Sequence, residues 1–206
     1  LMDRATIAAV DDWHHLGLDR EAEAMLMIES DQPGAGAVAE MEAARLACEA
    51  AGATSTVQAQ DAQEADWLRQ ARRLALRALE RQGTVRMEDV GVPRARVPQL
   101  LREIEAISVR HGIRCATFGH AGDGNLHPNF VFERDDPDAE RLTEAARADL
   151  YRAALALGGT VTAEHGIGAT RREFLPLQVG EETVAVMRRI KAALDPLGIL
   201  NPGRVV

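Results

Sequence analysis

The order of strand-like and helix-like segments along the chain predicts an α+β fold built on an antiparallel sheet. Two short strands, residues 113–118 and 126–132, flank a brief glycine-rich segment. Strands joined by so short a connection pair antiparallel, because a parallel pair needs a crossover of about a dozen residues or more. A purely parallel sheet is therefore not expected, and the helices are expected to pack on one face of the sheet.

Helices are predicted where apolar residues recur at three- and four-residue spacing and a glycine or proline marks an end. In chain order they are 1–20, with Trp13 near the end of a short helix; 35–51, stopped by Gly52; 61–82, ending near Gly83; 97–111, after Pro93; 137–157, before Gly158-Gly159; and 181–194. A turn-rich tail follows from Asp195-Pro196.

Further strands are predicted where apolar or alternating runs lie between turn residues. They are 24–29, an apolar run expected to be buried; 54–60, which alternates; 84–87; and 160–163, after the glycine pair.

Composition excludes several classes of protein. The net charge of −8 argues against a surface that binds nucleic acid or anionic membranes. No apolar run approaches the roughly 20 residues that span a bilayer. Cys48 and Cys115 do not suggest a disulfide framework or a cysteine zinc site, so a cytoplasmic location is the default. The chain begins at Leu1 without a visible signal peptide, and we treat it as a fragment or an expression product.

Two clusters of polar residues point to chemistry. His120 and His127 are separated by a segment with Gly122 and Gly124, and a sharp turn there would bring both imidazoles to one side. Two imidazoles and a carboxylate are a common ligand set for a divalent metal, and Glu164 is the candidate carboxylate. Asn129, two residues past His127, shares its strand face and could also reach the ion. The alternative is a glycine-rich hairpin with incidental surface histidines.

His165 follows Glu164 directly and is a candidate general base near neutral pH. Gly166 could turn it toward the site; the alternative is a hydrogen-bonded structural histidine. Asp123 and Asn125 are expected to shape the turn through side-chain hydrogen bonds to the backbone.

A short motif at residues 34–39 fits G-x-G-x-x-A, with Asp61 farther on, and could be a dinucleotide fingerprint. Against this, residues 29–33 separate the first glycine from the predicted strand and include two acids, which are unfavourable beside a pyrophosphate. A nicotinamide-linked enzyme is therefore the weakest of the alternatives.

Three ordered motifs, His120–Pro128, Glu164–Gly168 and Asp195–Arg204, resemble the C-terminal domain of FAD-linked oxidases. This family includes glycolate oxidase catalytic subunits, D-lactate dehydrogenases and D-2-hydroxyglutarate dehydrogenases. Arg72 and the segment 88–94 also fit, so the resemblance covers essentially the whole of residues 1–206. It implies a ferredoxin-like antiparallel sheet with helices on one face, plus a C-terminal helical segment. It also implies an FAD domain of the vanillyl-alcohol oxidase type, expected in the same polypeptide and absent from this chain.

The resemblance assigns roles to single residues. His120, His127 and Glu164 would hold a divalent ion, zinc or manganese, and His165 would act as the base. The substrate would be bound by Arg72, which would grip its carboxylate, and by Asn129. Asn201 and Gly203 would lie near the flavin.

Three positions depart from the family pattern, and one of them bears on which substrates are expected. Met87 stands where some members have a lysine for a second carboxylate, which disfavours a diacid. Arg171 replaces a frequent lysine and keeps its charge but not its geometry. The tryptophan usual just before Arg72 is displaced, with Trp67 nearby.

The expected function is that of the substrate domain of an FAD-dependent 2-hydroxy-acid oxidase or dehydrogenase of the glycolate or D-lactate type. The expected partners are the small hydroxy acid, an electron-transfer protein and a second copy of the chain in a homodimer. The expected location is the cytoplasm, with attachment to the membrane periphery through redox partners as an alternative. The alternative is a stand-alone metal-binding or regulatory module without flavin activity.

Overall fold

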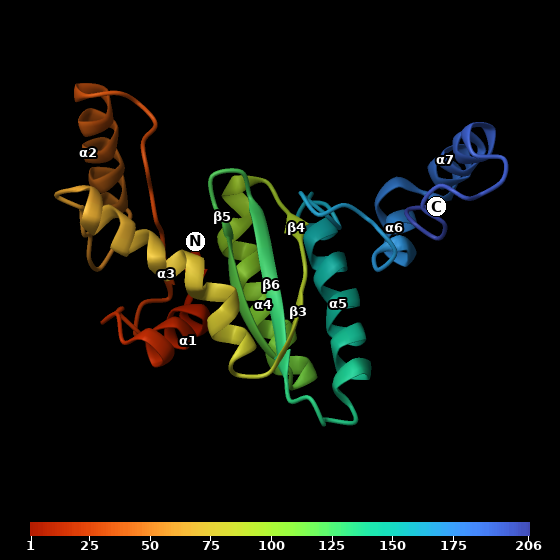
Figure 1. The fold of residues 1–206 in the computed structure, drawn as a ribbon, viewed down its shortest axis with the longest axis horizontal. Helices are drawn as coiled ribbons and strands as arrows, with labels where there is room; N and C mark the ends of the chain where they lie inside the picture. Colours follow the sequence, from red (N-terminus) through yellow and green to blue (C-terminus); the bar gives the residue numbers. More distant parts are fainter. The chain divides into compact units, whose positions relative to one another are not determined.

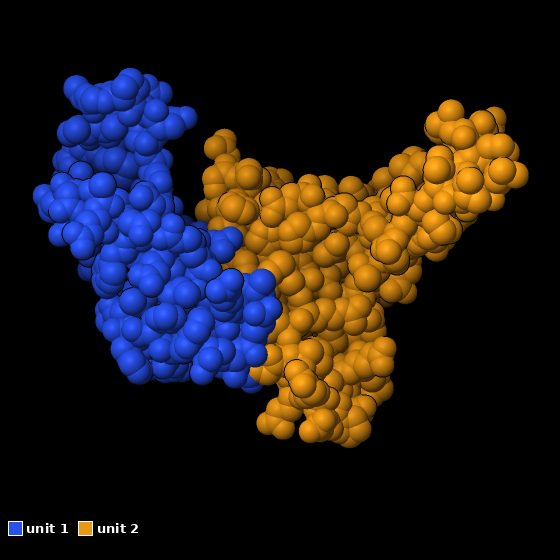
Figure 2. Space-filling model, viewed as in Figure 1, with its two compact units in different colours: residues 1–82 blue, residues 83–206 orange.

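The computed structural model describes residues 1–206, which form two compact units, residues 1–82 and residues 83–206 (Figure 2). Every strand pair within either unit is antiparallel, and helices and strands are mixed along the chain, so the predicted α+β class is confirmed. No helix has the length and apolar character needed to cross a bilayer.

The first unit is mainly helical (Figure 1). Helix α1 (Arg4–His14) packs against helix α3 (Ala62–Glu80), whose buried residues recur at helical spacing: Ala71, Ala75, Ala78 and Leu79. Asp3 and Asp61 cap α1 and α3 by accepting hydrogen bonds from backbone amides in the first turn. The elements are β1 (Met2–Asp3), α1 (Arg4–His14), β2 (Ala24–Met25), α2 (Ala35–Ala50) and α3 (Ala62–Glu80).

Of the two strands predicted in this unit, 24–29 is much shorter in the structure and 54–60 is not formed. Of residues 24–29 only β2 is a strand, because its partner β1 is two residues long and α1 begins at Arg4; Leu26 and Ile28 are exposed. Residues 54–60 are irregular and mostly exposed, since their alternation offers little apolar surface to bury. The glycine motif at 34–39 opens α2, but no strand leads into it, which removes the context that a dinucleotide fingerprint needs.

The second unit holds a hairpin of β5 (Arg114–His120) and β6 (Asn125–Phe132) (Figure 1). Helix α4 (Val97–His111) packs against β5, and α5 (Ala139–Ala156) packs against α4. The predicted helices 97–111 and 181–194 are confirmed residue for residue as α4 and α7. Gly112, at φ +62°, ends α4 in the left-handed conformation. The elements are β3 (Thr84–Met87), β4 (Val90–Gly91), α4 (Val97–His111), β5 (Arg114–His120), β6 (Asn125–Phe132), α5 (Ala139–Ala156), α6 (Leu175–Val179) and α7 (Glu181–Leu194), with single 3₁₀ turns at Arg94–Arg96 and Arg172–Phe174.

Strands β3 and β4 are two parts of one extended segment along β6. Met87 pairs with Asn129 and Val90 pairs with Leu126, so the register is the same on both sides of the break. Within the break, the amide of Glu88 donates to the carbonyl of Pro128 at 2.8 Å. Proline has no N–H with which to return this bond, so the ladder is interrupted where two acidic residues occur.

Residues 160–163 do not form the predicted strand. Thr160 makes a single antiparallel bridge to Gly91, and the chain then bends. The reason is that the following amides donate to side chains instead of a neighbouring strand: Val161 to Gln178, and Ala163 to Asp89.

The turn between β5 and β6 depends on one glycine. Gly124 has φ +83°, and a Cβ atom there would lie 1.9 Å from the carbonyl oxygen of Val92. We expect Gly124→Ala to lower the free energy of unfolding by about 2 kcal/mol or more, through strain and the clash. Gly122, in the same turn, has open space around it, so Gly122→Ala should change stability by less than about 0.5 kcal/mol. Urea denaturation of both variants tests this, and equal losses would contradict it.

Candidate active site

The register of the hairpin places the two histidines of the first cluster on one face. Phe118 lies opposite His127 in the ladder, and His120 is two residues past Phe118 on the same strand. Side chains two residues apart share a face, so His120 and His127 are diagonal neighbours across the pair. Their ring centroids are 5.6 Å apart, and the rings are nearly perpendicular. The predicted approach of the two imidazoles is thus produced by the hairpin pairing.

The second cluster meets the first. The Oε1 atom of Glu164 lies 3.0 Å from Nε2 of His127 and 3.9 Å from Nε2 of His120. The imidazole of His165 stacks on that of His127, with centroids 4.9 Å apart and planes at 9°. On an extended segment the adjacent residues Glu164 and His165 would face opposite ways. Here both reach His127, because the loop bends between Thr162 and Gly166.

The donor atoms of His120, His127 and Glu164 suit one divalent cation. All three lie within 4.8 Å of one another. A tetrahedral ion bound at about 2.1 Å separates its ligand atoms by about 3.4 Å, and the two nitrogen–oxygen distances here bracket that value. The ligand types, two imidazole nitrogens and a carboxylate oxygen, are those of many catalytic zinc sites.

Burial distinguishes the members of the cluster. His127 is 4% exposed, whereas the side chains of His120 and Glu164 are about half exposed and that of His165 is 38% exposed. Burial lowers the pKa of His127, and His165 lowers it further, against the opposing effect of Glu164 and Asp89. The imidazole of His127 therefore stays neutral, the form that binds metals, to a lower pH than usual.

A buried charge cluster lies behind this site. Glu88, which is 2% exposed, accepts a hydrogen bond from the Tyr151 hydroxyl and forms ion pairs with Arg147 at 2.5 Å and Arg171 at 3.4 Å. Burial, reinforced by Glu88, raises the pKa of Tyr151, so the phenol stays protonated and donates to the carboxylate. Arg171, one of the departures noted in the sequence, is thus a buried structural cation.

The remaining predicted residues lie in different places. Asn129 is fully buried, and its Nδ2 donates to the carbonyls of Ala116 and His127. Arg72 is a half-buried residue of α3, in the first unit. Asn201 and Gly203 lie in the exposed tail.

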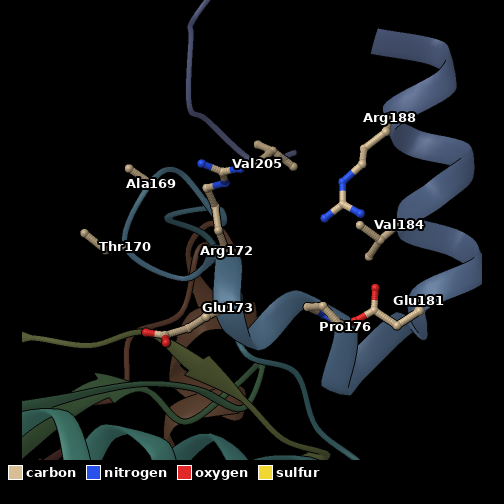
Figure 3. Close-up of a pocket in the computed structure, with 9 residues that line it drawn as sticks. All are labelled: Ala169, Thr170, Arg172, Glu173, Pro176, Glu181, Val184, Arg188 and Val205. Carbon is tan, nitrogen blue, oxygen red and sulfur yellow. The ribbon is translucent and has the colours of Figure 1, made fainter. Parts of the chain in front are cut away.

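The tail is attached to the loop that follows the second cluster. Val205 donates to the carbonyl of Gly168 at 2.7 Å, and Arg172 donates to that of Gly203 at 3.3 Å. An open cavity of about 490 Å³ lies beside these contacts, and Arg188 extends toward it from α7 (Figure 3). None of the clustered histidines lines this cavity.

A family model described as "FAD linked oxidases, C-terminal domain" matches residues 1–205. The chain belongs to this family. The family inferred from the three motifs is thereby confirmed, and its members are FAD-linked.

Relatives in this family include the glycolate oxidase subunit GlcD of Bacillus subtilis, 38% identical over 99% of this chain and 44% of that protein. A probable mitochondrial D-lactate dehydrogenase of Danio rerio is 41% identical over 57% of this chain and 24% of that protein. The chain thus spans less than half the length of these relatives.

The fold of this FAD-linked oxidase domain is also found in a solved structure, 4-ethylphenol oxidase from Gulosibacter chungangensis in complex with isoeugenol. The two share a TM-score of 0.54 at 20% identity, over 83% of this chain and 36% of that one. At this identity the likeness extends to the fold.

In the sequence, Glu88 and Asp89 stand out only as part of the family pattern, which predicts no role for them. Two adjacent acids inside a strand-like run were the available signal. Carboxylates buried in a sheet require partners, which are Arg147 and Arg171 for Glu88 and the loop at 162–165 for Asp89.

The buried ion pair should matter more than an exposed one on the same helix. Arg147→Met removes a partner of buried Glu88, and we expect a loss of about 3 kcal/mol in the free energy of unfolding. Arg152→Met removes an exposed pair with Asp149 and should cost less than about 0.5 kcal/mol. Urea denaturation compares the two variants, and a loss below about 1 kcal/mol for Arg147→Met would contradict the role of the pair.

Proposed function

We propose that this chain is the substrate domain of an FAD-dependent oxidase or dehydrogenase that converts a 2-hydroxy acid, of the glycolate or D-lactate type, to the 2-oxo acid. The observation that carries the proposal is the convergence of His120, His127, Glu164 and His165 in a chain of the FAD-linked oxidase family. The names of the similar glycolate oxidase subunit and D-lactate dehydrogenase support this substrate class.

In this proposal His120, His127 and Glu164 hold a divalent cation, zinc or manganese. When bound, the cation would lower the pKa of the substrate hydroxyl, and the flavin would accept the hydride. The half-exposed side chains of His120 and Glu164 leave this site open to a small ligand, while buried His127 fixes its inner side.

His165 is proposed as the base that takes the hydroxyl proton on a ring nitrogen. Its stacking on His127 fixes the plane of the ring, and the side chain is 38% exposed, so a substrate can reach it. Asn129 has both Nδ2 hydrogens directed to backbone carbonyls, so its Oδ1, which is buried and lacks a hydrogen-bond partner, is the side-chain atom left to accept a hydrogen bond from the substrate.

In this proposal Arg72 binds the substrate carboxylate through a bidentate ion pair, and the tail residues Asn201 and Gly203 contact the flavin. Met87 carries no charge for a second carboxylate, which favours a monocarboxylic substrate. Because the reduced flavin must pass its electrons on after each turnover, we also propose a redox partner that accepts them, in the cytoplasm or at the membrane periphery.

The metal and the substrate class are tested together in the full-length protein. We expect near-stoichiometric zinc or manganese by elemental analysis, and loss of that metal in the double variant His120→Ala, His127→Ala. D-lactate or glycolate should bleach the flavin absorbance of the wild type only. If no 2-hydroxy acid reduces the flavin, the substrate assignment fails; if the wild type holds no metal, the ligand assignment fails.

The base is tested by His165→Gln, which keeps a polar side chain without a titratable nitrogen. We expect the rate of flavin reduction to fall by about 10²–10⁴-fold, with the metal retained. His111→Gln, which removes a histidine paired with Asp149, is the control and should leave the rate unchanged. Stopped-flow absorbance measures both variants, and a wild-type rate in His165→Gln would refute the assignment.

A further inference from the structure

The carboxylate of Asp89 is bonded to the segment that carries Glu164 and His165. Its Oδ2 accepts hydrogen bonds from the Thr162 hydroxyl at 2.6 Å and from the amides of Ala163, Glu164 and His165 at 2.8, 3.1 and 2.9 Å. Three successive backbone amides thus converge on one oxygen. This arrangement fixes the bend of the loop and with it the directions in which the two side chains leave the backbone.

The other oxygen of Asp89 faces the buried histidine. Met87 pairs with Asn129 and Val90 with Leu126, so Asp89 falls opposite His127 when the register is continued. Its Oδ1 lies 3.9 Å from Nδ1 of His127, a buried nitrogen that has no hydrogen-bond partner. Glu164 lies nearer to the ring, at 3.0 Å from Nε2, so Asp89 alone does not decide which nitrogen carries the proton. A cation bound at Nε2 would leave the proton on Nδ1, and Asp89 is the carboxylate that faces it there.

We infer that Asp89 is the positioning residue of this site: it presents Glu164 and His165 to the ligand and faces the Nδ1 side of His127. This inference rests on the proposed function. Asp89 acts through these residues. A carboxylate oxygen of Asp89 also lies within 4.8 Å of a ring nitrogen of His127 and of His165, a group that could hold a cation, but we assign Asp89 no role as a ligand. It is fully buried, and its Oδ2 already accepts four hydrogen bonds.

The charge state of Asp89 agrees with this role. Burial alone would raise the pKa of its carboxyl group, but the hydrogen bonds from Thr162 and from the amides of His165 and Ala163 outweigh it. The net pKa lies below the ordinary value, so the group is ionised and accepts from all its donors.

The far end of the same loop has a separate anchor. Arg171 donates to the carbonyl of Gly166 at 3.1 Å, Arg147 donates to that of Thr170 at 2.9 Å, and both arginines pair with Glu88. Removal of Asp89 should therefore leave the loop attached at 166–171. The loss of order should be confined to residues 162–165, which carry the functional side chains.

The experiment compares Asp89→Asn with the wild type in the full-length flavoprotein. Asparagine keeps the shape but replaces one acceptor oxygen with a donor. We expect zinc affinity, measured by competition with a chromogenic chelator, to fall by about 10- to 100-fold. Hydrogen exchange at the amides of 163–165 should accelerate, while exchange at 166–171 stays slow. Thr162→Val, which removes one donor to the same carboxylate, is a milder variant and should lose about threefold.

Asp195→Asn is the matched control. Asp195 is also a buried acid whose oxygens accept backbone amides, those of Ile199 and Leu200, but it has no contact with the histidines. We expect it to lose stability and to keep wild-type zinc affinity. Equal zinc affinity in Asp89→Asn and the wild type would overturn the inference, as would an equal loss in Asp195→Asn.

Failure of the proposed function gives a different result. A wild type that binds no zinc would refute the metal assignment alone. Flavin reduction by the hydroxy acid would then decide the inference: a slower rate at unchanged KM in Asp89→Asn supports positioning of His165, and an unchanged rate overturns it.

Discussion

The geometry of the site depends on one backbone hydrogen bond that is missing from the sheet. Pro128 lies in β6 and has no N–H to donate to the strand beside it, so the ladder between β6 and the extended segment of β3 and β4 is interrupted at Glu88 and Asp89. Because neighbouring residues on an extended segment face opposite ways, the carboxylate of Glu88 turns toward Arg147 and Arg171, and that of Asp89 turns toward the histidine hairpin.

These two carboxylates hold the loop between them. Asp89 accepts the amides at its start, and Glu88 orients the two arginines that bind carbonyls near its end. The loop has little regular structure of its own, yet it carries Glu164 and His165. Buried ionic groups are costly unless they are fully paired, and here the pairing also specifies the geometry of the site.

Helices and the hairpin were predictable because their causes are local. The spacing of Leu100, Ile104 and Ile107 defines α4, and Gly112 ends it, so its bounds followed from the sequence. The approach of His120 to His127 followed from the turn between them. Residues 160–163 were predicted wrongly because the amide of Val161 donates to Gln178 and that of Ala163 to Asp89, more than 70 residues earlier, and no local pattern reveals such partners.

The role of Asp89 escaped prediction for the same reason. A carboxylate in a strand-like run has no periodicity of its own, and its partners become visible only when the loop is folded over it. The family resemblance, by contrast, needed no geometry, because three motifs in order were enough to identify it, and the match over residues 1–205 bears it out.

The interruption of the ladder has a consequence for how this domain can change over evolutionary time. Because the two acids face opposite sides of one extended segment, insertion or deletion of a single residue between Met87 and Val90 would exchange their directions and move both anchors at once. Insertions should therefore be tolerated in the exposed connection between α2 and α3 but rejected here. At this point the number of residues is constrained as strongly as their identity.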